Sequence, residues 1–174
     1  LFALLWTSRL RWAGLVPVAC AFLLWMATDR PALLVSADGA LIGLLTDEGR
    51  SLSKPRGGGF AARTWLENDG DGATQGDAAG RGGLVLAKGH AMGRIGSTEV
   101  HHLWGKGAAD ASRAVCTGNT LLVISAETNG VTGPCRIIDM GVLSETGALA
   151  LYPNEEALTV VPTNRPGAHR PWAP

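Results

Sequence analysis

Apolar residues near the amino end of the chain follow one another without the polar interruptions of an amphipathic helix. Residues 12–28 carry no charge, with arginines before them and Asp29 and Arg30 after them. A helix that crosses a hydrocarbon core of about 30 Å needs about 20 residues, so this run is at the short end of that length. The pattern predicts one transmembrane helix over 12–28, within which Cys20 faces lipid or a neighbouring helix. Two alternatives stay open, a buried core helix and a signal peptide.

The charges that flank this run predict its orientation. Arg9 and Arg11 precede it, and cytoplasmic flanks carry the excess of Lys and Arg, so the rest of the chain is expected outside the cytoplasm. Two cysteines lie in that remainder, Cys116 and Cys135. An oxidising compartment favours a disulfide between them. The equal alternative is that both cysteines are unbridged and act as small buried hydrophobic residues.

Residues 31–174 alternate short apolar runs with turn signals, the pattern of one globular domain. The runs 33–36 and 40–45 flank Asp38 and Gly39. Asp-Gly between such runs predicts a β-hairpin, because both turn positions of a type I′ turn need positive φ. A second turn is predicted at 47–49, and a helix over 60–68.

Later runs predict strands over 84–87, 99–104, 120–125 and 136–140, a turn at 93–97, a helix over 108–116, and a closing hairpin of 147–152 with 157–161. Residues 120–125 are apolar on both faces, which indicates a buried central strand. Glycines are frequent over 57–107, where we expect a thin core and long loops. A helix between buried strands favours a small mixed α/β sandwich.

Composition limits the function classes. Hydrophobic residues are 46% of the 174 and charged residues only 17%, against about 25% in a typical soluble protein. Lys plus Arg and Asp plus Glu are both 15, so no global positive field attracts nucleic acid. Between Arg50 and Arg113, nine basic residues stand against six acidic ones, an excess too scattered to predict a binding stripe.

The histidines do not form a metal-binding pattern. His101 and His102 are adjacent, so on a strand they point to opposite faces and cannot both reach one metal ion. His90 and His169 are isolated, and the string HxHxDH is absent. We therefore expect solvated or core histidines. Asp139, at the end of a predicted strand, is an acid–base candidate, but a turn cap is the better interpretation.

Other catalytic and nucleotide-binding motifs are absent. There is no GxSxG, and Lys106 does not belong to a phosphate-binding loop, because Gly107 stands where Ser or Thr is required. We assign no catalytic, cofactor-binding or metal-binding residue, expect no cofactor and identify no small-molecule substrate. Whether the chain is an enzyme stays open, with a non-enzyme favoured.

Several sequence landmarks occur in a familiar order. They are VSADG (35–39), FAARTWLENDGD (60–71), Ala114–Cys116 leading into LLVIS, CRIIDM (135–140) with GALAL (147–151), and RPWAP (170–174). In this order they resemble the carboxy-terminal region of ComEC-type DNA-internalisation competence proteins, in the short form of alphaproteobacteria. The resemblance covers nearly the whole chain.

The resemblance implies a role in DNA uptake. In that family a polytopic membrane core is thought to conduct one DNA strand across the inner membrane during natural transformation. The terminal domain often resembles a metallo-β-lactamase fold proposed to degrade the other strand. The metal-binding string of those forms is absent here, and a Gly-rich stretch around His90–His102 replaces an expected CDxxGC-like element. The resemblance thus implies a non-catalytic accessory domain, α/β in class, with a degenerate metallo-β-lactamase-like fold.

The resulting expectation has three parts: a remnant of a preceding membrane region over 1–11, the transmembrane helix over 12–28, and the globular domain over 31–174. The implied location is the bacterial inner membrane with the domain in the periplasm. The implied partners are the membrane and single-stranded DNA, the latter through a channel core that this chain lacks. Two alternatives remain: a residual metal-dependent nuclease that uses His90, His101, His102 or Asp139, and a tethered extracytoplasmic domain unrelated to DNA.

Overall fold

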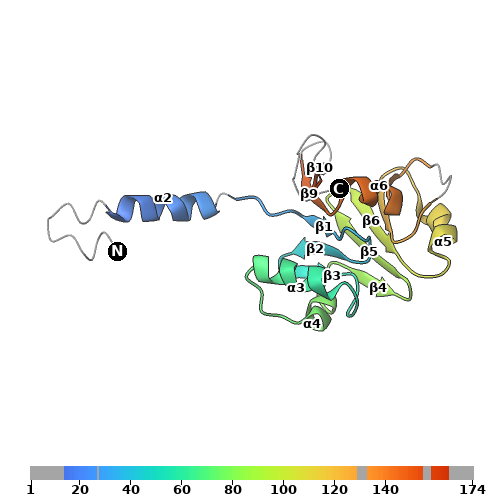
Figure 1. Cartoon of the computed structure of the whole chain (residues 1–174), viewed down its shortest axis with the longest axis horizontal. Helices are drawn as coiled ribbons and strands as arrows, with labels where there is room; N and C mark the ends of the chain where they lie inside the picture. Colours follow the sequence, from blue (N-terminus) through green and yellow to red (C-terminus); the bar gives the residue numbers. More distant parts are fainter. Residues whose placement is uncertain (1–13, 27, 129–132, 155–157, 165–174) are drawn as a thin grey trace. The chain divides into compact units, whose positions relative to one another are not determined.

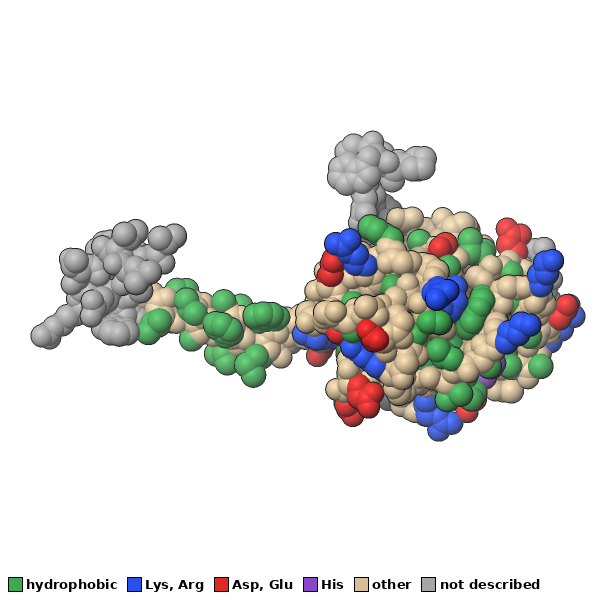
Figure 2. Space-filling model, turned by 90° about the horizontal axis from the view of Figure 1, so that it is seen from below, with side chains coloured by type: hydrophobic (Ala, Val, Ile, Leu, Met, Phe, Trp, Pro, Cys, Tyr) green, Lys and Arg blue, Asp and Glu red, His purple; other side chains and the backbone are tan. Residues whose placement is uncertain are grey.

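The computed structural model describes residues 14–26, 28–128, 133–154 and 158–164, which belong to two units, 1–30 and 31–174 (Figure 1). The first unit contains helix α2 (Leu15–Met26), which buries no residue and shows hydrophobic side chains over its visible face (Figure 2). Among the described residues, no helix is both long and apolar enough to cross a membrane. The transmembrane helix predicted over 12–28 is therefore not supported, since the 12 residues of α2 extend only about 18 Å. Residues 1–13 and 27 lie outside the described part.

The second unit contains two five-stranded sheets. The first has the order β10-β9-β1-β2-β3 and is antiparallel throughout. Its strands are β1 (Leu33–Val35), β2 (Ile42–Thr46), β3 (Gly49–Leu52), β9 (Leu149–Pro153) and β10 (Leu158–Pro162).

The second sheet has the order β4-β5-β6-β7-β8. Its first three strands pair antiparallel, whereas β6, β7 and β8 pair parallel. The strands are β4 (Val85–Ala87), β5 (His90–Ile95), β6 (Thr98–Leu103), β7 (Thr120–Ile124) and β8 (Arg136–Ile138). Parallel strands need long crossover connections, and the helix that follows β6 provides one.

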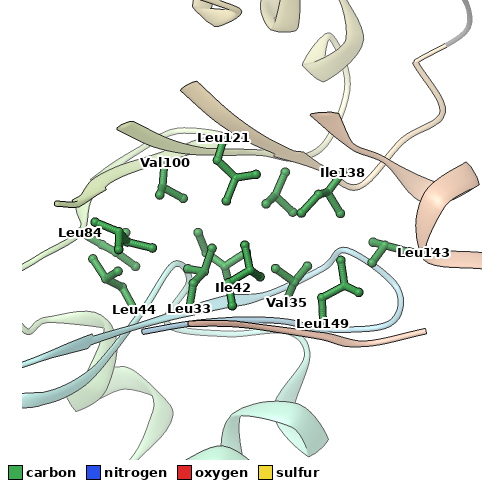
Figure 3. Close-up of a cluster of buried hydrophobic side chains, with 13 residues drawn as sticks. Leu33, Val35, Ile42, Leu44, Leu84, Val100, Leu121, Ile138, Leu143 and Leu149 are labelled. Carbon is green, nitrogen blue, oxygen red and sulfur yellow. The ribbon is translucent and has the colours of Figure 1, made fainter. Parts of the chain in front are cut away.

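The main hydrophobic core lies between the two sheets (Figure 3). Val100, Leu121 and Ile138 project from the second sheet toward side chains of the first. Those facing residues include Leu33 and Ile42, both fully buried. The alternation of inward and outward positions along each strand places one apolar row of each sheet in this core.

Helices cover the outer face of each sheet. Helices α3 (Gly59–Asn68) and α4 (Gln75–Ala79) bury Ala62, Leu66, Ala78 and Ala79 in a cluster with Leu41 and Leu52. Helix α5 (Ala108–Val115) buries Ala108 in a cluster with Leu103, Leu122 and Ile124. The layers therefore run helix, sheet, sheet, helix, and the predicted mixed α/β sandwich is confirmed (Figure 1).

Most predicted elements are present. The 33–45 hairpin is the β1–β2 pair, the helix over 60–68 is α3, and the helix over 108–116 is α5. The run 120–125 contains β7 over Thr120–Ile124, whose residues are all buried, and β7 lies between two neighbouring strands. The closing hairpin is the β9–β10 pair.

The predicted Asp-Gly turn has a different conformation from type I′. Gly39 has a φ of 59°, but no non-glycine residue of the described chain, Asp38 included, has a positive φ. The loop is longer than two residues, because the backbone N–H of Ser36 donates to the carbonyl of Leu41. The Asp38 carboxylate instead accepts from the Ser36 hydroxyl and the Ala40 N–H.

The glycine-rich stretch is more ordered than predicted. The predicted turn at 93–97 is wrong over its first half, since β5 continues to Ile95. Gly93 permits a close approach there, because a Cβ would lie 2.8 Å from the Gly83 carbonyl oxygen. The sequence pattern did not predict two helices, α4 and α6 (Met140–Thr146). Helix α6 begins at Met140, the last residue of the strand predicted over 136–140.

Candidate functional site

The carboxyl ends of the parallel strands β6, β7 and β8 meet at one edge of the second sheet. In open α/β sheets, ligands usually bind just beyond this edge. The loops 104–107 and 125–128 follow β6 and β7 there, and loop 36–41 of the first sheet lies against them, since a Cβ on Gly39 would lie 3.2 Å from the Ile124 carbonyl oxygen. We call these loops, loop 53–58 and the ends of β6, β7 and β8 with the adjoining Asp139 the carboxyl edge.

His102 links the two sheets at the carboxyl edge. It is fully buried at the end of β6, and its Nδ1 lies 2.8 Å from the Ser53 hydroxyl while its Nε2 lies 3.0 Å from the Gly39 carbonyl oxygen. A carbonyl only accepts, so Nε2 carries the proton and Nδ1 accepts from Ser53. The Ser53 oxygen in turn accepts from the N–H of Ile42.

This arrangement keeps His102 neutral. Burial is the main cause and lowers its pKa from 6.5 to about 4, although the hydrogen bond to Gly39 acts in the opposite direction. The pair of Ser53 and His102 has the distance of a nucleophile and its base, but both side chains are buried and every polar atom is engaged. A catalytic base must reach a substrate proton, so this pair is structural.

Asp139 caps helix α6, whereas the sequence suggested a turn cap at the end of a strand. Its carboxylate accepts from the Val142 N–H at the start of α6 and from the N–H and hydroxyl of Thr128. Burial raises the pKa of this carboxyl, but the hydrogen bonds from Thr128 and Val142 outweigh burial and hold it below its ordinary value. Its oxygens are therefore occupied by structural contacts.

The other described histidines form a pair on the outer face of the second sheet. His90 Nε2 lies 2.9 Å from His101 Nδ1, and the rings are stacked with centroids 5.1 Å apart. The opposite orientation of His101 and His102 is confirmed, whereas the isolation of His90 is wrong, because β5 and β6 pair and bring it to His101. Burial and His101 lower the pKa of His90.

No metal centre is formed within 14–26, 28–128, 133–154 and 158–164. No three or more His, Cys, Asp or Glu side chains of these ranges are grouped so that they could hold a metal ion. The Glu99 carboxylate lies beside the histidine pair, 3.8 Å from His101 Nε2. His169 lies outside the described residues.

Cys116 and Cys135 form a disulfide in the structure, with their Cα atoms 5.1 Å apart. It joins the end of α5 to the start of β8, across 19 positions of sequence. Cys20 is exposed on α2 and free.

Trp104 is the aromatic residue of the carboxyl edge. Its ring lies 4.8 Å from the ring of the buried His102, measured between centroids, and the Lys54 ammonium lies 5.4 Å from its centroid. Burial lowers the pKa of Lys54, and the negative charge of Asp38 opposes that effect. The indole is half-buried, so part of it faces solvent.

The basic residues of the middle of the chain separate into two groups. Five of the nine pair with carboxylates: Arg50 with Asp69, Arg63 with Glu67, Arg81 with Asp71, Arg94 with Glu99, and Arg113 with Asp110. Among the described residues, the other four have no carboxylate within 4.0 Å; they are Lys54, Arg56, Lys88 and Lys106.

These four cations lie on loops beside Trp104. Lys54 and Arg56 belong to loop 53–58, which reaches the indole through Lys54. Lys88 belongs to the turn before β5, whose Gly89 carbonyl accepts from the Trp104 N–H at 3.0 Å. Lys106 follows Trp104 by two residues. Of these side chains, Lys54 lies over the Trp104 ring; we call Lys54, Arg56, Lys88, Lys106 and Trp104 the basic–aromatic cluster.

The sequence contained weak signals for this cluster. SKPRGGG (53–59) and WGKG (104–107) each combine cations with glycines, and Gly57, Gly58, Gly105 and Gly107 all have positive φ. Neither stretch matches a known phosphate-binding motif, and only the fold brings them together. Ser53, Lys54 and Trp104 were therefore missed.

Comparison with protein-family models, with curated proteins and with solved structures finds no match for the chain.

Proposed function

We propose that this chain is the carboxy-terminal portion of a ComEC-type DNA-uptake protein, and that residues 31–174 act as a non-catalytic accessory domain in natural transformation. The ordered landmarks from VSADG to RPWAP support the family. The helix, sheet, sheet, helix layering supports a degenerate metallo-β-lactamase-like fold, since that fold also covers two packed sheets with helices on their outer faces.

The engagement of the polar groups at the carboxyl edge carries the non-catalytic part of this proposal. His102 uses both ring nitrogens, Ser53 both donates and accepts, and Asp139 uses both carboxylate oxygens. A general acid or base must have an atom available to the substrate. The groups that resemble catalytic residues are instead part of the folded framework.

The proposed location is the periplasmic side of the bacterial inner membrane, with the membrane as a partner. The Cys116–Cys135 disulfide supports an oxidising compartment, because disulfides persist in the periplasm and are rare in the cytosol.

A deletion in a naturally transformable host that encodes this chain tests the proposal. Removal of the codons for 31–174 at the native locus should lower transformation by linear DNA at least tenfold. Plasmid entry by electroporation, which bypasses the uptake apparatus, is the control and should not change. Unchanged transformation after the deletion would overturn the role in DNA uptake.

A further inference from the structure

The outer face of the second sheet is covered by helix α5 over β6 and β7, and it is more open over β4 and β5. Val85 on β4 is 66% exposed, and Met92 on β5 is 40% exposed. These two residues lie directly opposite each other in the β4–β5 pairing. This part of the sheet is therefore accessible to a ligand from solvent.

The histidine pair lies beside Met92 on this open part of the sheet. His90 Nε2 and His101 Nδ1 are 2.9 Å apart, so one nitrogen donates to the other and a single proton lies between the rings. Two imidazole nitrogens that bind one metal ion at about 2.0 Å lie about 2.8 to 3.5 Å apart for bond angles of about 90 to 120°. An ion that takes the place of the proton can thus bind both rings after a small rotation of each.

Glu99 favours the form of His101 that a metal ion requires. Its carboxylate lies 3.8 Å from His101 Nε2 and is oriented by Arg94 at 2.9 Å. A negative charge beside Nε2 favours the proton on that nitrogen, which leaves the lone pair of Nδ1 directed at His90. Histidines that bind metal ions usually have a carboxylate or carbonyl at their second nitrogen in this way.

Met92 provides a third ligand of a different kind. It lies directly opposite His101 in the β5–β6 pairing and two residues from His90, so the three side chains share one face. The Cβ atoms of opposite residues are about 4.5–5.5 Å apart, a distance that the flexible methionine side chain spans. Among the described residues, no group of three His, Cys, Asp and Glu side chains could hold a metal ion. The ligands available at the pair are thus two imidazoles and one thioether.

This ligand set selects copper in its reduced form. Thioether sulfur favours Cu(I), and imidazole binds copper well. Zinc sites use Cys, His and carboxylate ligands, and manganese prefers oxygen ligands, whereas the Glu99 carboxylate is engaged by Arg94. We propose that His90, His101 and Met92 form a surface site for Cu(I).

Binding of Cu(I) is measured on the full chain under nitrogen, by competition with a chromogenic Cu(I) chelator. Every protein carries Cys20→Ser, because the exposed thiol of Cys20 would itself bind Cu(I). One Cu(I) per chain is expected, and a tenfold excess of Zn²⁺ or Mn²⁺ should not release it. Binding of less than half an ion per chain, or release by either competing ion, would overturn the assignment.

Matched substitutions locate the site. His90→Gln removes one imidazole and should weaken Cu(I) binding at least tenfold, whereas His169→Gln, outside the described residues, should leave the affinity within about threefold. Met92→Leu removes the thioether at similar volume and should also weaken binding at least tenfold, with Met140→Leu as its control. Urea unfolding establishes that each variant is folded. Equal affinities within either pair of variants would overturn the site.

X-ray absorption at the copper edge identifies the ligands. The loaded chain should show two nitrogen neighbours at about 2.0 Å and one sulfur neighbour at about 2.3 Å, and Met92→Leu should lose the sulfur alone. With Cys20 replaced and the other two cysteines joined in a disulfide, that sulfur belongs to a methionine. A sulfur neighbour that persists in Met92→Leu would overturn the assignment of the third ligand.

Discussion

At the scale of single residues, His102 shows how a polar side chain becomes part of the core. A buried imidazole is costly unless both nitrogens are hydrogen-bonded. Here the Ser53 hydroxyl and the Gly39 carbonyl satisfy the two ring nitrogens, and the Ser53 oxygen in turn accepts from the N–H of Ile42. Sequence reasoning predicted a core or solvated histidine, but it could not identify the partners, which lie 49 and 63 positions away.

The stability of the domain should depend on the pH through His102. Its pKa is about 4 when folded and 6.5 ordinarily, so between these values the unfolded state binds more protons. The contribution of neutral His102 to the free energy of unfolding is fully present above pH 6.5. As the pH falls to 4 this contribution is lost, which lowers the free energy of unfolding by about 3 kcal/mol. Urea unfolding at pH 7 and at pH 4 measures the loss.

His102→Gln provides the comparison, because its amide can donate to Gly39 but does not titrate in this range. The fall in the free energy of unfolding between pH 7 and 4 should be smaller in this variant by about 3 kcal/mol. The matched control His90→Gln, at a more exposed histidine with a lowered pKa, should retain most of the fall. Parallel pH curves for His102→Gln and the wild type would contradict the assignment.

At the scale of elements, the hydrophobic pattern of a segment was sufficient to predict its secondary structure where that pattern alone is typical of a strand or a helix. The all-apolar run became β7, and the apolar runs around Asp38 and Gly39 became β1 and β2. The sequence pattern did not predict strand β5, because its small and polar residues are held in a strand by pairing with β4 and β6 on either side. On the predicted helix α3, Phe60 is 88% exposed, while Ala62 and Leu66 form the buried face.

The disulfide between the end of α5 and the start of β8 should stabilise the second sheet. Closing a loop with a sequence separation of 19 reduces the entropy of the unfolded chain, which corresponds to about 3 kcal/mol. Cys116→Ala/Cys135→Ala should lower the free energy of unfolding by about that amount. A reducing agent should lower the Tm of the wild type and leave that of the double variant unchanged. An equal effect of the reductant on both proteins would show that another cause is responsible.

At the scale of the whole molecule, the order of elements along the sequence was sufficient to predict the α/β layers. It did not predict which residues meet at the carboxyl edge. Lys54, Lys88 and Trp104 come from separate segments, and the β5–β6 and β6–β7 pairings determine their proximity. Charge counting showed a basic excess but not which cations had partners. The five ion pairs that neutralise the rest of this region are contacts of the tertiary structure.

The same layers explain why the carboxyl edge resembles a catalytic site without the properties of one. It lies where parallel strands end, and it contains a histidine, a serine and an aspartate. Each of these side chains forms hydrogen bonds that join segments of the fold. The account therefore predicts no turnover at this edge.

Metal content and DNA cleavage, measured together on the purified full chain, test this claim most directly. After equilibration with zinc or manganese and removal of free ion, the account predicts far less than one ion per chain. With Mg²⁺ or Mn²⁺ present, it predicts no cleavage of linear DNA above that of a His102→Gln/Asp139→Asn variant. Stoichiometric metal, with cleavage that this variant abolishes, would contradict the account.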